Sequence, residues 1–123
     1  MNFFKISEEY TINLDNVSLI TGDYYKDALN VYFNTTDQEQ TIKVSDTKQV
    51  VKSLLEIGNF VSLKNGGGWE ICIVNVDNIA FFKENQDGCL HIFFNGDLVQ
   101  SLIVDKENED IILKGKQEFV EHF

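Results

Sequence analysis

The chain has 123 residues, 43% of them hydrophobic, and its ten basic and twenty acidic residues give a net charge of −10 at pH 7. All of the basic residues are lysines, and nucleic-acid affinity rests on Lys and Arg at phosphates, so the composition argues against direct binding of nucleic acid or of an anionic membrane. With two cysteines, no visible secretory signal and no apolar run near the ~18 residues of a membrane span, we expect a cytoplasmic protein with reduced thiols.

The first half of the chain predicts a series of short strands. Asp15 and Asn16 favour a turn, because Asx side chains bond the backbone of their own turn. The stretch 29–33 alternates, which places Asn30 and Tyr32 on the face opposite its apolar side chains. We expect strands at 3–6, 17–21, 29–33 and 41–44, with a polar turn at 35–39.

A helix is predicted after these strands. Residues 45–47 read Ser-Asp-Thr and offer an N-cap. Apolar residues at 50, 51, 54 and 55 then fall on one stripe of a helix, and Gly58 is expected to end it.

The second half repeats this order. Residues 12–17 read Ile-Asn-Leu-Asp-Asn-Val, and residues 74–79 read Val-Asn-Val-Asp-Asn-Ile. Around this signature, 2–4 matches 59–61, 29–34 matches 90–95, and 42–44 matches 102–104. Because the Asn-x-Asp-Asn signature is not a generic strand pattern, the sequence predicts an internal duplication.

We therefore predict an α+β, mostly β fold of two tandem modules, 1–58 and 59–123. Each is an antiparallel β-meander with one C-terminal helix. In the second module, turns are expected at 65–68 and 95–97, and the acidic stretch 105–110 precedes a last helix that carries Phe119, Val120 and Phe123. A module of ~60 residues is marginal alone, so we expect the two to pack as one compact unit across a pseudo-twofold axis.

Each half resembles the small flagellar and swarming-motility proteins of the FlbD/SwrD type, here present twice. The matching stretches are 12–17 with 29–55, and 74–79 with 90–123, although Asn34-Thr35 stands where the pattern has Asn-Gly. The resemblance implies a β-rich, non-catalytic accessory protein of bacterial or phage origin, and it transfers no flagellar role.

No catalytic, cofactor or metal site is expected. Cys89 and His91 share a strand face, but there is no Cys-x-x-Cys or His-x-x-x-His spacing. No nucleophile elbow is present. Asp15 and Asp77, which the repeat relates, are expected to serve turns, and the Gly-rich loop at 65–68 lacks the residues of a phosphate cradle.

Two surfaces are candidates for contact with a protein partner. Tyr24 and Tyr25 lie at a predicted hairpin tip, where either both contact a partner or one packs inward and the other is merely exposed. Tyr32 and its counterpart Phe93 lie opposite the core faces, and Ile103 joins Phe93 there. Three uses remain open for this apolar outer face: packing between modules, homodimerisation and contact with a foreign partner.

The acidic stretch offers a second function. It either forms a solvated face or a helix start, or it imitates phosphates through Glu107, Glu109 and Asp110. The sequence thus predicts a non-catalytic adaptor that acts through protein–protein contacts. The alternative is an acidic inhibitor, encoded by a phage or mobile element, of a basic nucleic-acid enzyme.

Overall fold

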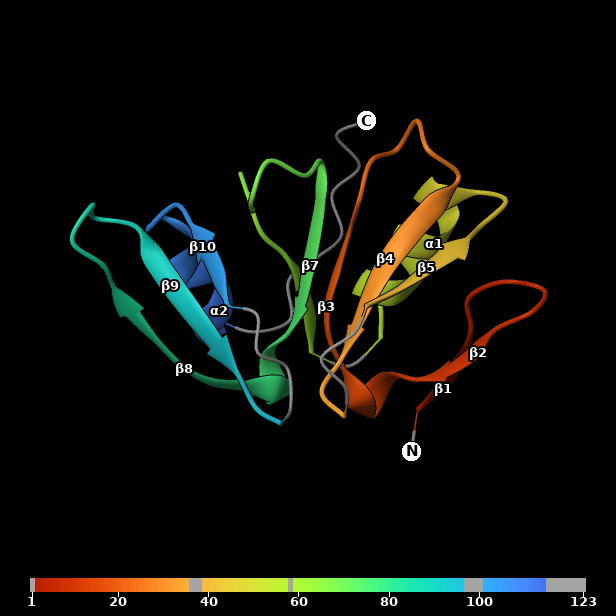
Figure 1. The fold of residues 1–123 in the computed structure, drawn as a ribbon, viewed down its shortest axis with the longest axis horizontal. Helices are drawn as coiled ribbons and strands as arrows, with labels where there is room; N and C mark the ends of the chain where they lie inside the picture. Colours follow the sequence, from red (N-terminus) through yellow and green to blue (C-terminus); the bar gives the residue numbers. More distant parts are fainter. Residues whose placement is uncertain (1, 36–38, 58, 97–100, 115–123) are drawn as a thin grey trace.

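A computed structural model describes residues 2–35, 39–57, 59–96 and 101–114. These residues form ten strands, two α-helices and two 3-10 turns, and every strand pairs antiparallel with its neighbours (Figure 1). The first half holds β1 (Phe3–Lys5), β2 (Thr11–Asn13), η1 (Leu14–Asn16), β3 (Val17–Gly22), β4 (Ala28–Phe33), β5 (Glu39–Lys43) and α1 (Thr47–Leu55). The second holds β6 (Phe60–Ser62), β7 (Ile71–Asn75), η2 (Val76–Asn78), β8 (Ile79–Glu84), β9 (Leu90–Phe94), β10 (Leu102–Val104) and α2 (Asn108–Lys114).

The strands form three sheets. β1 and β2 make a two-stranded hairpin, the five-stranded sheet runs in the order β5-β4-β3-β7-β6, and the three-stranded sheet runs β10-β9-β8. The five-stranded sheet crosses the predicted boundary at residue 58, because the β6–β7 hairpin of the second half pairs with β3 of the first half. Figure 1 shows β3 and β7 at the centre, with α1 and β5 on one side and β8 to β10 on the other.

Both faces of the five-stranded sheet are buried at its centre, around β3 and β7, whereas β5 is exposed except at Ile42. On one face, Ile20, Leu29 and Ile73 pack with α1 and the β1–β2 hairpin. On the other face, Leu19 and Tyr32 pack in one cluster with β6, β7, β9, β10 and α2. All six residues of β3 are consequently buried.

The two halves follow the same local plan. The element order is the same in both, and the hairpin registers correspond, with Phe3 opposite Asn13 in β1–β2 and Phe60 opposite Asn75 in β6–β7. Each half has a register shift at the start of its long strand. A twofold axis would require reciprocal pairing, in which β2 joins β8 as β7 joins β3. In the described residues β8 pairs with β9 alone, so the expected pseudo-twofold arrangement does not describe the pairing.

The Asn-x-Asp-Asn signature forms the 3-10 turns, as expected for a turn role. The first Asn of the signature accepts a hydrogen bond from the backbone N–H of the Asp at 3.1 Å in both halves. The Asp carboxylate accepts one from the Asn that directly precedes the first strand of its half, at 3.0 Å in the first half and 2.8 Å in the second. The two sets are Asn2, Asn13 and Asp15, and Asn59, Asn75 and Asp77.

The first helix was predicted closely, and the second begins earlier than predicted. Asp46 caps α1 by accepting from the Gln49 N–H at 3.2 Å, and Val51, Leu54 and Leu55 of the predicted stripe are buried. By contrast, α2 begins at Asn108, so the acidic stretch runs into the helix instead of preceding it. Gly58, Asp97 and the predicted helix segment at 119–123 lie outside the described residues. Neither described helix is long and apolar enough to span a membrane.

Candidate protein-contact site

An open aromatic surface lies on the three-stranded sheet. Phe81 of β8 and Phe93 of β9 are opposite each other in register, and their rings stack with centroids 4.5 Å apart at 15°. The His91 ring is tilted against the Phe93 ring, with their centroids 4.2 Å apart. Ile103 of β10 lies opposite His91 in register. Phe81 is 54% exposed and Ile103 is 50% exposed. We call these four side chains the aromatic face; Lys83 borders it, with Nζ 5.7 Å from the Phe93 ring centre.

The alternation of β9 produces this face. Leu90, Ile92 and Phe94 are buried on the inner side of the sheet, which turns His91 and Phe93 outward. The bulge between Ile79 and Phe81 re-aims the β8 side chains locally. The sequence pattern indicated Phe93 and Ile103 but not Phe81. The signal that could have indicated Phe81 is its correspondence to Leu19 of the first half.

Tyr32 is not a contact residue for a separate partner, as was predicted, but takes another of the uses left open for its face, packing between the two halves. It does lie on the outer face of its strand, as the alternation indicated, but only 7% of it is exposed. The second half covers it, together with Leu19. Burial and a hydrogen bond with Glu39 raise the pKa of the Tyr32 hydroxyl. In the first half the outer face therefore serves internal packing and is closed to a separate partner.

Tyr24 and Tyr25, at the predicted hairpin tip, differ in their exposure. Tyr24 packs beside the first core, its backbone N–H donates to Glu70 Oε1 at 2.9 Å, and burial followed by the charge of Glu70 raises the pKa of its hydroxyl to about 12. Tyr25 is 75% exposed, with Lys26 Nζ 5.6 Å from its ring centre. Only Tyr25 is thus available for contact, which matches the expected alternative of one packed and one exposed ring.

Part of the acidic stretch holds the fold together. Asp105 accepts from the Asn65 side chain at 2.8 Å. Buried Asn108 bonds both the N–H and the carbonyl of Lys64, each at 2.8 Å. Lys106 pairs with Glu84 at 2.6 Å, and this contact raises the pKa of the lysine. A positive charge therefore interrupts the stretch.

The three acidic residues predicted as contact residues differ in exposure. Glu107 and Asp110 are exposed, whereas Glu109 is half-buried. Glu109 and Asp110 lie in the first turn of α2, where negative charge interacts favourably with the helix dipole. A role at the helix start therefore accounts for these two residues. Glu107 is exposed and lies just before the helix.

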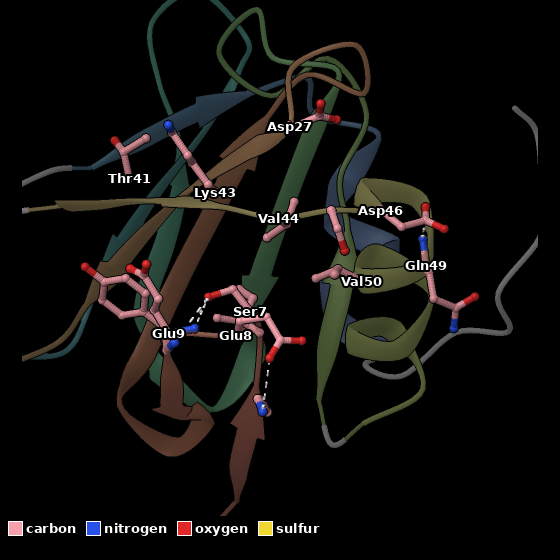
Figure 2. A pocket seen from close by; sticks show the side chains of 14 residues that line it. Ser7, Glu8, Glu9, Asp27, Thr41, Lys43, Val44, Asp46, Gln49 and Val50 are labelled. Carbon is pink, nitrogen blue, oxygen red and sulfur yellow. Dashed lines mark hydrogen bonds and ion pairs between the residues drawn. The ribbon is translucent and has the colours of Figure 1, made fainter.

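A cleft of about 880 Å³ opens between the β1–β2 loop, β5 and the start of α1 (Figure 2). Its acidic side chains outnumber its lysines, and several serve local structure. Asp46 caps α1, Ser7 Oγ accepts from the N–H groups of Glu9 and Tyr10, and Lys5 lies 3.7 Å from Glu8 at an exposed position. The lining residues are Lys5 to Tyr10, Asp27, Thr41, Lys43 to Asp46, Gln49 and Val50. None of the polar side chains that line this cleft is buried.

The cysteines and histidine form no metal centre in the described part of the chain, where no group of three or more candidate ligands converges. Cys72 is buried, and burial raises the pKa of its thiol to about 12. His91 Nε2 lies 2.7 Å from Ser101 Oγ, a pairing the sequence did not suggest. Within the described residues no carboxylate bonds the His91 ring, so the third member that orients a catalytic imidazole is not among them.

No family model matches the chain, and neither the curated proteins nor the solved structures include one that is significantly similar to it. The resemblance of each half to the FlbD/SwrD type therefore stays a prediction.

Proposed function

We propose that this protein is a non-catalytic protein-binding module, and that its contact surface is the aromatic face of the second half. One observation carries the proposal: exposed Phe81 stacks on half-buried Phe93 on the outer side of a sheet whose opposite side packs into the second core. Exposed contiguous apolar surface on a small protein commonly marks an interaction site. Aromatic residues are also enriched in the cores of protein–protein interfaces.

The first half supports this assignment. Leu19 and Tyr32 occupy the positions of Phe81 and Phe93, since Leu19 is opposite Tyr32 in β3–β4 as Phe81 is opposite Phe93 in β8–β9. Leu19 and Tyr32 are 4% and 7% exposed because the second half covers them. The same surface is therefore occupied in one half of the chain and open in the other.

We also infer that the two halves arose by tandem duplication of one module. Matching element order, hairpin registers, bulge positions and signature hydrogen bonds support this inference. The duplication explains why one chain carries both a covered and an uncovered copy of the same surface.

A lysate pull-down tests the binding function. Tagged wild-type protein is incubated with bacterial lysate at low and high salt, beside Phe93→Asp and the control Leu113→Asp, which alters an apolar side chain of α2 that is 69% exposed. A partner held by apolar contact should survive high salt, be lost with Phe93→Asp and be kept by the control. Retention that is indifferent to Phe93→Asp would refute the assignment of the aromatic face.

Inhibition of a basic nucleic-acid enzyme is the second candidate, supported by the net charge of −10 and the exposed Glu107 and Asp110. Such a partner should be a nuclease or polymerase that is retained only at low salt, because salt screens exposed charges. Charge reversal at Glu107, Glu109 and Asp110 should abolish that retention, whereas Phe93→Asp should not.

A further inference from the structure

The edges of β3 and β8 differ although the strands correspond. β3 has β4 on one side and β7 on the other, and all six of its residues are buried. Among the described residues β8 has β9 on one side and no strand on the other, and four of its six residues are exposed. An unpaired strand edge is a template for another strand. The β8 edge therefore lacks the hairpin that the β3 edge holds.

The chain also carries a hairpin with an unused edge. The β6–β7 hairpin fills the β3 edge through β7, with Leu19 opposite Val74 and Ile20 opposite Ile73. The β1–β2 hairpin has the same internal register, but within the described part of the chain β2 pairs only with β1. β2 thus offers the edge that corresponds to the docked edge of β7.

Corresponding side chains are buried at the docked edge and exposed at the open ones. Phe60 of β6 is 3% exposed, and its counterpart Phe3 of β1 is 64% exposed. Leu19 of β3 is 4% exposed, and its counterpart Phe81 of β8 is 54% exposed. The two open surfaces thus present apolar side chains at the positions that the internal contact buries.

The signature asparagines show the same contrast. Asn75 and Asn78 reach across to the first half, where their amides donate to backbone carbonyls of Leu14, Asp15 and Val17 at 2.8–3.3 Å. Their counterparts Asn13 and Asn16 donate no side-chain hydrogen bond within the described residues. Their amide donors are therefore available for the equivalent contact.

The open edges lie at opposite ends of the molecule. Figure 1 places the β1–β2 hairpin at one end of the long axis and β8 at the other, so a single chain in this arrangement cannot join them. We propose that the occupant of each open edge is a second copy of this chain: β2 of one copy pairs antiparallel with β8 of the next. This inference rests on the proposed binding function and names its partner.

The internal contact fixes the register of the new one. Phe81 takes the place of Leu19 and Ile12 that of Val74, so Phe81 lies opposite Ile12 and Phe82 opposite Thr11. Such a head-to-tail contact is heterologous, and it yields a closed ring or an open chain of copies.

The contact should be weaker than its internal template. β2 has three residues where β7 has five, and the register sets Glu9 opposite Glu84. Like charges directly opposite each other destabilise a strand pair. Two copies also repel at long range, since each carries a net charge of −10, so added salt should strengthen the association. Glu9→Lys should strengthen it as well, by setting an opposite charge against Glu84.

Sedimentation equilibrium of the full chain tests the proposal. The wild-type mass should rise above the 14.1 kDa of one copy as concentration increases. Phe3→Asp alters the hairpin and Phe81→Asp alters the β8 edge; each should weaken association about tenfold or more, as loss of a central aromatic contact commonly does. Both side chains are more than half exposed, so the variants should keep the wild-type far-UV circular dichroism. Leu113→Asp, on α2, is the matched control and should associate like the wild type.

Mixing the two variants gives the decisive result. Phe3→Asp retains an intact β8 edge and Phe81→Asp an intact hairpin, so an equimolar mixture should form dimers that neither variant forms alone. Association of Phe3→Asp by itself would overturn the proposal in favour of β8 edges pairing with each other. Failure of the mixture to dimerise would overturn it too. A monomeric wild type would refute self-association alone, because the Phe93-dependent pull-down judges the binding function separately.

Discussion

The sharpest stability prediction concerns Asn78 and its counterpart Asn16. Asn78 is 9% exposed, and its amide donates to the carbonyls of Asp15 at 3.0 Å and Val17 at 2.8 Å, which joins the second half to the first. Asn16 holds the same place in its own signature. Its carbonyl accepts from Asn34 at 2.8 Å, as that of Asn78 accepts from Asn95 at 2.8 Å, but its side chain makes no comparable contact among the described residues.

Asn78→Ala removes both hydrogen bonds. At about 1 kcal/mol for each bond, the loss is about 2 kcal/mol of unfolding free energy. With a urea m value of about 1.5 kcal/mol per molar, the unfolding midpoint should fall by about 1.3 M. Asn16→Ala should change the free energy by about 0.5 kcal/mol or less. Urea titrations followed by Trp69 fluorescence measure both variants, and equal losses would refute the claim that this side chain acts between the halves.

Two further predictions concern a glycine and a thiol. Gly96→Ala should lower the free energy of unfolding by about 2 kcal/mol or more, because Gly96 has φ +90° and an added Cβ would overlap the Asn34 carbonyl. Gly88→Ala, at φ +78° with open space around the added Cβ, should lower it by about 1 kcal/mol. Equal shifts of the melting temperature would contradict this difference. At pH 8 a thiol reagent should label Cys89 well before Cys72, since burial raises the pKa of Cys72 to about 12 and thiolate is the reactive form. Rapid labelling of native Cys72 at pH 8 would refute its burial. Because the pKa of Cys72 is raised, the thiol stabilises the folded state below its ordinary pKa, and this contribution is lost as pH rises toward 12.

Local patterns predicted much of the fold. The alternation at 29–33 placed Leu29 and Val31 in one core and Tyr32 on the opposite face, as the structure confirms. The cap at Asp46 and the turn role of Asp15 and Asp77 were also predicted correctly, because each depends on residues close together in the chain. α2 begins earlier than the predicted helix, inside the acidic stretch for which a helix start was one alternative, since Glu and Asp suit a first helical turn as well as the loop before it.

The candidate site could be predicted only in part. Alternation shows which way a side chain points from its strand, so Phe93 and Ile103 were found. It does not show whether another layer covers that face, so Tyr32 was predicted as a contact residue although it is buried. Phe81 was missed because its outward position depends on the bulge at the start of β8.

The sequence by itself determined most strands of the first half, the cap of α1 and the recurrence of one pattern in both halves. The tertiary structure decided which edges meet. Backbone donors and acceptors are the same on every strand, so the sequence of β7 does not specify β3 as its neighbour. The pairing of Leu19 with Val74 joins residues far apart in the chain and depends on burying both faces of the central sheet. For that reason Asn75 and Asn78 bond across the halves while Asn13 and Asn16, in the same signature, do not.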